Sequence, residues 1–477
     1  MSHVLAQAAE TAPIDVGATA WVLAATALVL LMGPGLALFY GGMVGSRNVL
    51  TMMMQAVVTM ALVAVVWVVV GHSLAFGSSG PLIGDLRFLG MTDLNAPVPG
   101  FTGEEALSVP PVVFAGFQMM FAVVTAVLII GAAADRWRFG AFVPFMVLWP
   151  ILVYAPIAHW VFSPEGWAAR TGALDFAGGT VVHVNAGAAA LAVALVLGRR
   201  RGWPQPATRP HNLPFVLIGA SLLWFGWFGF NAGSALDANA VAGYALVNTN
   251  AAAAAGLLGW LVVERIRYGK PTTLGAASGV VSGLVAITPC AGYIGPMAAL
   301  VVGATSGALC ALAVTLKSWL GYDDALDVVG VHLVAGVVGS LCVGLFASTA
   351  VNPDGADGLF AGGAYSLLGA QVITVLAVGA YAFVVTYAIG ALLDRVVGNR
   401  VSAGVERAGL DLAMHGESAY TTDPPLVPVR APQASAEPGP NGAANGSGNG
   451  YGTPGRRPAH ARPDAGMRRY PDGGEPR

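Results

Sequence analysis

The chain has 477 residues, of which 56% are hydrophobic and only 10% are charged, and its mean hydropathy is +0.68. A soluble domain carries about 25% charged residues, so this composition excludes an ordinary soluble protein and indicates an integral membrane protein. The formal net charge of −2 identifies no partner, and we expect no nucleic acid to bind. The three cysteines, at positions 290, 310 and 342, lie within or beside apolar segments and indicate neither a disulfide framework nor a metal site.

The apolar segments follow one another from the start of the chain. The first fifteen residues have no basic segment followed by an apolar one, so no cleaved signal peptide is expected, and residues 1–17 are predicted to form a short extracytoplasmic arm. Each membrane crossing needs about 20 apolar residues. Eleven crossings are predicted, at residues 18–41, 51–75, 111–134, 141–162, 178–198, 213–233, 241–263, 272–289, 294–316, 327–349 and 365–392.

The basic residues predict how these crossings are oriented. Fourteen Lys or Arg lie in alternate loops and in the segment from residue 393 to Arg407, whereas the opposite loops carry two, Arg87 and Arg170. Basic residues accumulate on the cytoplasmic side of a membrane. The pattern therefore predicts an N-terminus outside the cell and a C-terminus in the cytoplasm. It also supports eleven crossings, because one wrong crossing would disturb the alternation.

The residues after the last crossing change in character. Residues 18–392 are expected to form one transmembrane domain, and residues 393–421 form a polar, amphipathic segment. From about Pro424 the chain is rich in Pro, Gly, Ala, Asn, Ser and Arg, with almost no large apolar residues. Such a segment cannot bury a core, so residues 422–477 are predicted to be a disordered, low-complexity tail.

Two histidines lie in the middle of uncharged apolar stretches. His183 is followed by Val-Asn-Ala-Gly and His332 by Leu-Val-Ala-Gly, so Ala-Gly follows each at the same offset. An ionisable side chain at bilayer depth is costly and indicates a functional site. The two fall in the fifth and tenth crossings. This repeated sequence pattern predicts a five-plus-five inverted repeat, followed by one extra helix. The two halves of the repeat would bring the histidines together.

The histidine pair allows more than one interpretation. Two neutral imidazoles in contact can share a proton and offer nitrogen atoms to a small molecule passing along an apolar channel. A pair that only links helices across the bundle is the plainer alternative. A metal site is the least supported interpretation, because no third His, Cys or carboxylate lies beside the two histidines at ligand spacing.

Aromatic residues form a second candidate constellation. Phe117 and Phe121 are four residues apart on one helix face, and the sixth crossing contains Trp227, Phe230 and Ser234. Aromatic faces attract cations, and a hydroxyl group could replace part of a cation's hydration shell. Ordinary packing and interfacial anchoring remain the alternative for this cluster.

An acidic residue precedes the first histidine. Asp175 lies at the outer start of the fifth crossing, eight residues before His183. A carboxylate there could draw in cations, but capping of the helix or bonding of loop amides is the alternative interpretation.

These residues, in this order, resemble the ammonium transporter family (Amt, Mep and Rh proteins), and its Amt branch in particular. The segment that resembles the family runs from Gly33 to Tyr420, which is nearly the whole chain before the low-complexity tail. Its most specific pieces are Asp175–His183, Gly226–Ser234, Gly330–His332, Gly409–Asp411 and His415–Glu417.

The resemblance implies an all-α fold and assigns roles to the candidate residues. It implies a homotrimer of eleven-helix protomers in the cell membrane, each with its own pore and without a cofactor. His183 and His332 would be the twin histidines of the pore, and Trp227 would line it near them. The stacked gate would be Phe121 with Phe230. The outer ammonium recruitment site would be formed or supported by Phe117, Phe162, Ser234 and Asp175.

One position departs from the family pattern. Many Amt proteins have a tryptophan after the sequence Ile-Ala-His at the outer vestibule, whereas here Ile157-Ala158-His159 is followed by Trp160, Val161 and Phe162. Phe162 is expected to hold the vestibule position. It offers a π face weaker than that of tryptophan, which puts the affinity of recruitment in doubt, and Trp160 or Trp167 is an alternative source of that face.

The segment before the low-complexity tail also resembles a family feature. It implies an ordered regulatory tail over residues 393–421, which couples protomers and binds a PII-type nitrogen regulatory protein at the cytoplasmic face. The residues that carry this resemblance are Glu406, Gly409, Asp411, His415, Gly416, Glu417 and Tyr420.

The residues and the resemblance together predict selective ammonium transport, with methylammonium as an analogue. Ammonium would be gathered outside and deprotonated, and ammonia would pass along an apolar pore while the histidines relay the proton. A passive ammonia or CO₂ channel, as in the Rh branch, is the first alternative, and an ammonium sensor is the second. A membrane enzyme is disfavoured, because no nucleophile–base–orienter set or metal cluster is found in the sequence.

Overall fold

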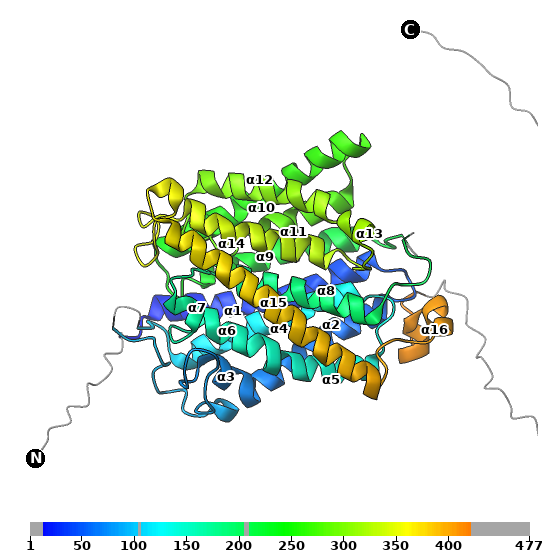
Figure 1. Ribbon diagram of the computed structural model, residues 1–477, viewed down its shortest axis with the longest axis horizontal. Helices are drawn as coiled ribbons and strands as arrows, with labels where there is room; N and C mark the ends of the chain where they lie inside the picture. Colours follow the sequence, from blue (N-terminus) through cyan, green and yellow to red (C-terminus); the bar gives the residue numbers. More distant parts are fainter. Residues whose placement is uncertain (1–12, 104–105, 205–208, 421–477) are drawn as a thin grey trace, which may run out of the picture. The chain divides into compact units, whose positions relative to one another are not determined.

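The computed structural model describes residues 13–103, 106–204 and 209–420. Within these residues the regular structure is helical, apart from an isolated bridge between Trp137 and Arg400 (Figure 1). Most of the predicted N-terminal arm and the whole predicted low-complexity tail, 422–477, lie outside the described residues. Those two predictions are therefore not tested by the fold.

Ten helical segments of the described residues are long and apolar enough to cross a membrane. They coincide with ten of the eleven predicted crossings, and the chain is a multi-pass membrane protein. The segments are Val16–Met43, Val49–Phe76, Pro111–Ala133, Phe139–Arg170, Gly179–Leu197, Leu213–Gly233, Ala240–Tyr268, Pro296–Leu320, Val329–Phe346 and Tyr365–Val396.

The eleventh predicted crossing corresponds to a shorter helix. α11 (Thr273–Ile287) has fifteen residues, which span about 22 Å at 1.5 Å per residue and fall short of the roughly 30 Å hydrocarbon core. The chain continues from it in a buried turn, where the Asn248 amide nitrogen donates to the carbonyl oxygens of Ala291 and Ile294 at 2.8 and 2.6 Å. Irregular backbone is tolerated at membrane depth when protein groups satisfy it in this way.

Four crossings are interrupted by a π-helical turn, and each turn divides a crossing into parts. Such turns are often found at functional sites, because they widen the helix and shift the direction of later side chains. The interrupted crossings are α2 (Val49–Val66), η1 (Trp67–Gly71) and α3 (His72–Phe76); α5 (Phe139–Trp149), η5 (Pro150–Tyr154) and α6 (Ala155–Phe162); η6 (Gly179–Val184) and α8 (Asn185–Leu197); and η7 (Val329–Leu333) and α14 (Val334–Phe346).

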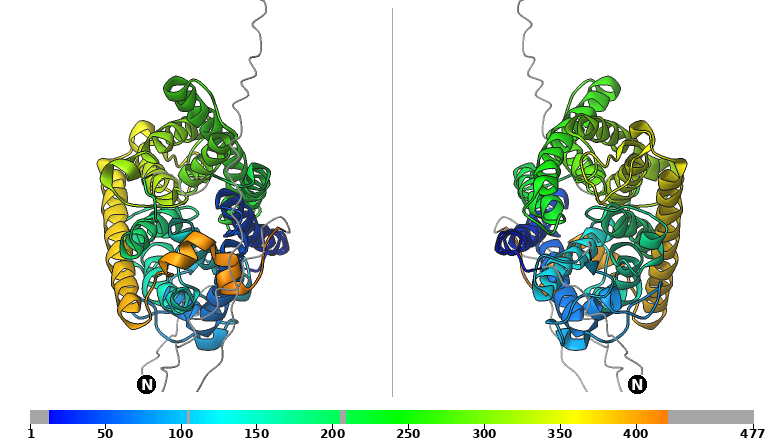
Figure 2. Two further views of the ribbon diagram at one scale, coloured as in Figure 1. Left: turned by 90° about the vertical axis from the view of Figure 1, so that its right-hand side faces the viewer. Right: turned by 90° about the vertical axis from the view of Figure 1, so that its left-hand side faces the viewer.

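α1 packs along α9, and α10 packs against both α11 and α12. The long α15 contacts both α8 and α14 and runs along one side of the bundle (Figures 1 and 2). The remaining helices are α1 (Val16–Met43), α4 (Pro111–Ile130), α7 (Trp167–Arg170), α9 (Leu213–Gly233), α10 (Ala240–Tyr268), α12 (Pro296–Ala313), α13 (Leu316–Leu320), α15 (Tyr365–Val396) and α16 (Ala403–Ala408), with short 3₁₀ or π turns η2 (Leu89–Met91), η4 (Gly131–Ala133), η8 (Leu359–Ala361) and η9 (Asp411–His415).

A buried ionic cluster joins the loops at the end of the bundle that carries α16, which we call the tail end. Arg136 is fully buried and donates to the carbonyl oxygens of Gly198, Ala134 and Asp323. Arg200 pairs with Asp323 at 2.9 Å and with Asp135 at 3.2 Å. Because the Asp323 side chain is fully buried, loss of its charge would leave Arg200 with Asp135 alone and would remove the negative charge that balances the buried Arg136 guanidinium.

Replacing Asp323 by Asn is expected to lower the stability of the protein by about 3 kcal/mol, since it breaks a buried ion pair. Burial would raise the pKa of the Asp323 carboxyl, but Arg200 and Arg136 hold that pKa below its ordinary value. The stabilisation is therefore present above the unfolded-state pKa of about 3.9 and is lost as the pH falls through the lower folded-state pKa. Midpoints of thermal unfolding at pH 7 and in acid measure both effects.

The matched control is Glu417→Gln, because Glu417 is exposed and charge neutralisation there removes no buried pair. Equal midpoints for Asp323→Asn and Glu417→Gln at pH 7 would contradict the role assigned to the cluster.

Candidate functional site

The two predicted pore histidines meet inside the bundle. The Nδ1 atoms of His183 and His332 lie 3.3 Å apart, and the ring centroids are 5.3 Å apart with planes inclined by 21°. Both side chains are buried, at 0% and 4% exposure. Nε2 of His183 has no hydrogen-bond partner within the described residues. The two histidines are thus 149 residues apart in the sequence but in contact in the structure.

The two halves build this contact in the same way. Each histidine lies in a π-helical turn, η6 or η7, followed by a helix of thirteen residues. The glycine four residues after each histidine faces the other half: a Cβ at Gly187 would lie 2.5 Å from the backbone nitrogen of Leu333, and one at Gly336 would lie 3.0 Å from that of Val184. The repeated Ala-Gly of the sequence therefore lets the two broken helices cross closely enough for the rings to touch.

A carboxylate caps the start of each π-helical turn, eight residues before its histidine. The Asp175 carboxylate accepts hydrogen bonds from four backbone N–H groups, those of residues 178–181, at 2.6–3.1 Å. Asp324, in the other half, accepts one from Val329 at 2.7 Å. Burial raises the pKa of the Asp324 carboxyl to about 6. In the sequence, the two positions correspond as an Asp eight residues before each histidine.

An aromatic stack continues from the histidine pair. The ring of His183 lies 5.3 Å from that of Trp227, with planes inclined by 19°, and Phe230 lies 4.3 Å from Phe121 in a stacked arrangement. All of these aromatic side chains are buried. The Trp227 indole nitrogen donates to the Thr288 hydroxyl at 2.8 Å, which fixes the indole plane. Thr288 was not predicted, because nothing in the local sequence distinguishes it.

A cavity of about 240 Å³ opens beyond Phe121, at the end of the bundle opposite the tail. All four residues expected at the outer recruitment site line it, namely Phe117, Phe162, Asp175 and Ser234. Phe162 contacts Phe121 edge-on, with centroids 6.0 Å apart. The Ser234 hydroxyl donates to the carbonyl oxygen of Phe230 at 2.8 Å, so its oxygen remains able to accept a hydrogen bond.

Gln118 is a lining residue of this cavity that sequence reasoning missed. Its side chain is 8% exposed, and its amide oxygen has no hydrogen-bond partner within the described residues. Its place between Phe117 and Phe121 in the helix could have drawn attention to it. A buried amide that lacks a partner beside a cavity is suited to hydrogen-bond a small polar occupant.

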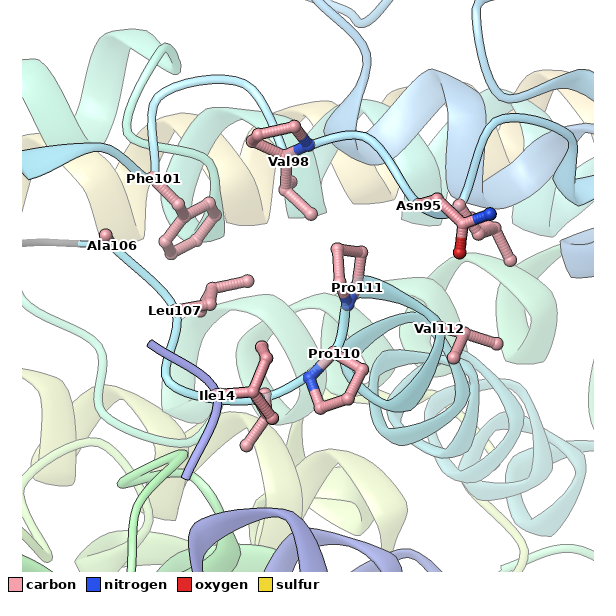
Figure 3. A pocket seen from close by; sticks show the side chains of 12 residues that line it. Ile14, Asn95, Val98, Phe101, Ala106, Leu107, Pro110, Pro111 and Val112 are labelled. Atoms are coloured by element: carbon pink, nitrogen blue, oxygen red, sulfur yellow. The ribbon is translucent and has the colours of Figure 1, made fainter. Parts of the chain in front are cut away.

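Trp160 and Trp167, the alternative sources of the missing π face, do not line this cavity. Trp160 packs against Trp167 and Tyr381, and its indole nitrogen donates to the carbonyl oxygen of Leu82 at 2.7 Å. Of the three candidate aromatic residues, Phe162 is therefore the one that lines the cavity. A larger hollow of about 340 Å³ lies between the outer loop and Ile14, and none of the predicted site residues lines it (Figure 3).

Beyond His332, a narrow space of about 10 Å³ continues from the pair toward the tail end. It is lined by Phe39, Tyr40 and Asp327 among others, and Asp327 forms an ion pair with Lys317 at 2.5 Å. The histidines therefore lie between a wider cavity at one end of the bundle and a constriction at the other.

Most of the predicted tail residues contact the bundle. The Asp411 carboxylate accepts hydrogen bonds from the backbone N–H groups of Leu50 and Thr51, at the start of α2. Glu406 accepts from the backbone N–H of Arg201 at 2.8 Å, the Tyr420 hydroxyl lies 2.9 Å from a ring nitrogen of His211, and the His415 ring packs edge-on against Phe139. Gly409 and Gly416 have positive φ angles of 100° and 70°. Glu417 is exposed, and its carboxylate forms no hydrogen bond or ion pair within residues 13–103, 106–204 and 209–420.

Comparison with known proteins decides the family. A profile of the Ammonium Transporter Family matches residues 20–420. The chain belongs to this family. Among family members with curated sequences, it is 49% identical over 453 residues to an ammonium transporter of Mycobacterium tuberculosis strain H37Rv, a match that covers 90% of this chain and 95% of the relative.

Solved structures of the ammonium transporter family share the fold. The crystal structure of Saccharomyces cerevisiae Mep2 is 37% identical, with a TM-score of 0.76, and the match covers 82% of this chain and 88% of Mep2. A structure named Sensor Amt Protein is 30% identical, also with a TM-score of 0.76, and covers 84% of this chain and 98% of its own.

Replacing Gly187 by Ala is expected to force α8 away from η7, because the new Cβ would lie within 2.7 Å of backbone atoms of Leu333 that cannot move aside. Overpacking of this kind costs about 1–3 kcal/mol. The midpoint of thermal unfolding measures it. The control is Gly369→Ala in α15, where the added Cβ meets open space. A Gly187→Ala midpoint as high as that of Gly369→Ala would contradict the close crossing.

Proposed function

We propose that this protein transports ammonium selectively across the cell membrane. The observation that carries the proposal is the buried histidine pair at the end of an aromatic stack that leads from a cavity. Membership of the ammonium transporter family supports it. In this proposal the chain crosses the membrane eleven times, as a five-plus-five inverted repeat with one extra helix, with its N-terminus outside and its tail end in the cytoplasm.

The outer cavity recruits ammonium in the first step. The faces of Phe117 and Phe162 attract the cation, and each π face contributes about 0.5–2 kcal/mol depending on how dry the cavity is. The Ser234 oxygen and the Gln118 amide oxygen accept hydrogen bonds that ammonium can donate in four directions. Asp175 has its two oxygens occupied by backbone N–H groups. Its role is therefore to hold the turn that presents His183 and to add negative potential.

The proton leaves ammonium at the stack of Phe121 and Phe230. Moving an intact cation through an apolar passage is costly, whereas neutral ammonia is small and loses only hydrogen bonds. Separation of the proton from ammonia therefore lowers the barrier, and potassium, which has no proton to release, stays outside. The narrow space beyond His332 then passes only a molecule of about this size.

The histidine pair carries the proton in the next step. Neutral imidazole has one donor and one acceptor nitrogen, so a single proton lies between the two Nδ1 atoms. One ring then presents an acceptor Nε2 and the other a donor Nε2. When the acceptor Nε2 takes up a proton, the shared proton moves across the 3.3 Å contact, and the second ring releases its own proton. Ammonia and its proton travel separately but arrive together, which moves net charge.

The tail is proposed to regulate this transport. Asp411 attaches it to α2, and Glu406 attaches it to the loop at Arg201. Glu417 remains exposed and is available to a partner, which we propose to be a PII-type nitrogen regulatory protein. A homotrimer with one pore per protomer is proposed on the resemblance to the Amt branch.

Sensing is a second candidate function, favoured by one observation. The structural relative named Sensor Amt Protein shares the fold over 84% of this chain. In that case the histidine pair would hold ammonium without passing it on, and ammonium would bind without any flux. A passive gas channel, by contrast, would give flux without charge movement.

Replacing His183 or His332 by Leu is expected to remove the ammonium-evoked current, because a leucine cannot accept or donate the shared proton. Currents of purified variants in proteoliposomes measure this loss, expected to exceed tenfold. The control is His72→Leu, because His72 is also buried within a crossing but packs against Phe76 and Phe88 and does not line the outer cavity. An undiminished ammonium-specific current in both single variants would exclude the relay.

Replacing Phe162 by Trp is expected to strengthen recruitment, because indole offers a stronger π face than benzene. A gain of about 0.5 kcal/mol corresponds to a half-saturating ammonium concentration lowered roughly twofold, and Phe162→Ala should raise it. Concentration dependence of the current measures both. If Trp and Ala at this position gave the same half-saturating concentration, Phe162 would have no part in recruitment.

A further inference from the structure

A second cavity lies at the tail end, between the tail and two loops of the bundle. Its volume is about 290 Å³, and it is separate from the histidine pair. One wall is formed by α16 and Gly409, the opposite wall by the loop at residues 45–48, and the rest by Asp135 and Arg201. The cavity therefore exists only while the tail lies against the bundle.

Three arginines from three different segments line this cavity: Arg47, Arg201 and Arg407. All three are exposed. None of their guanidinium groups forms a hydrogen bond or ion pair with the residues that the structure describes, although the backbone N–H of Arg201 donates to Glu406. Each guanidinium carries five donors in a planar fork, so the cavity holds many unused donors.

The two carboxylates in the lining cannot neutralise these arginines. Asp135 accepts hydrogen bonds from Asn48 at 2.6 Å and from Arg200 at 3.2 Å. Glu406 accepts from the Arg400 guanidinium at both oxygens, at 3.0 and 2.9 Å. The negative charges of the lining are thus already paired with other cations, and the charge of the three arginines is left in excess.

We propose that this cavity binds a small phosphate-bearing anion. Arginine forks match phosphate oxygens in bidentate pairs, and such charge-assisted hydrogen bonds are about twice as strong as neutral ones. A pocket for a drug-sized molecule measures about 300–1,000 Å³. At about 290 Å³, this cavity suits a phosphate or pyrophosphate group better than a whole nucleotide.

A bound anion would attach the tail to the bundle. Arg407 belongs to α16, whereas Arg47 immediately precedes the loop residue Asn48, which accepts a hydrogen bond from the backbone of Leu410. An anion that bridges Arg407 to Arg47 and Arg201 would therefore reinforce the same contact that Asp411 makes with α2. The inference does not depend on what the pore transports.

The test is calorimetric titration of inorganic pyrophosphate into the purified full-length protein in detergent at low ionic strength. We expect one site per chain, and Arg47→Gln, Arg201→Gln and Arg407→Gln should each raise Kd about tenfold or more. The matched control is Arg267→Gln, since Arg267 is exposed at the end of α10, where its guanidinium lies over the Tyr268 ring and outside the lining of this cavity. Its Kd should equal that of the wild type.

A second measurement guards against a variant that disturbs the tail. Pyrophosphate should slow tryptic cleavage after Arg407 in the wild type, as followed by mass spectrometry, and leave cleavage after Arg267 unchanged. No binding at millimolar pyrophosphate, equal Kd values for all four variants, or no protection of Arg407 would each overturn the proposal.

Nanodiscs distinguish the two sources of phosphate. If phosphatidylglycerol nanodiscs abolish pyrophosphate binding and phosphatidylcholine nanodiscs do not, the occupant is an anionic lipid headgroup. If binding persists in both, the occupant is a soluble phosphate compound. Either result supports a phosphate site, provided that the arginine variants weaken the binding.

Discussion

Two imidazole rings meet at the crossing of two broken helices, with their Nδ1 atoms 3.3 Å apart and no ion-pair partner among the residues that the structure describes. Burial of an ionised group in such a place is costly, so the pair is most stable when both rings are neutral. A neutral pair needs close contact to satisfy its nitrogens. Close contact in turn requires that the helix backbones approach, which Gly187 and Gly336 permit because they lack a Cβ.

Other features of the bundle support the position of these rings. The carboxylates of Asp175 and Asp324 cap the two π-helical turns from opposite halves, and Thr288 fixes the plane of Trp227 against His183. The stacked Phe121 and Phe230 separate the pair from the outer cavity. An apolar passage with a single proton-handling element in the middle treats a cation that can lose its proton differently from one that cannot. That difference is the physical basis of the proposed selectivity.

The sequence predicted the crossings and the histidine contact well, because both depend on a strong local signal. Apolar runs of 20 residues are conspicuous, and an ionisable residue inside one is rare. It left open whether Phe162, Trp160 or Trp167 faces the outer cavity, because the π-helical turn η5 shifts the phase of the helix that follows and an α-helical projection does not include that shift. It also could not predict that Asp411 caps α2. The two segments are 360 residues apart in the chain, and no local sequence pattern in either segment indicates that they pair. The position of Gln118 at the outer cavity and the bond between Thr288 and Trp227 depend on tertiary packing in the same way.

The central claim is that ammonia and its proton cross separately and together move charge. The most direct test is the current evoked by ammonium in proteoliposomes that contain the purified wild-type protein, with potassium and methylammonium as comparisons. The account predicts a current with ammonium, a current with methylammonium, and none with potassium. If ammonium evoked no current while the internal pH of the vesicles changed as ammonia equilibrated, the protein would be a neutral gas channel and the proton relay would be wrong.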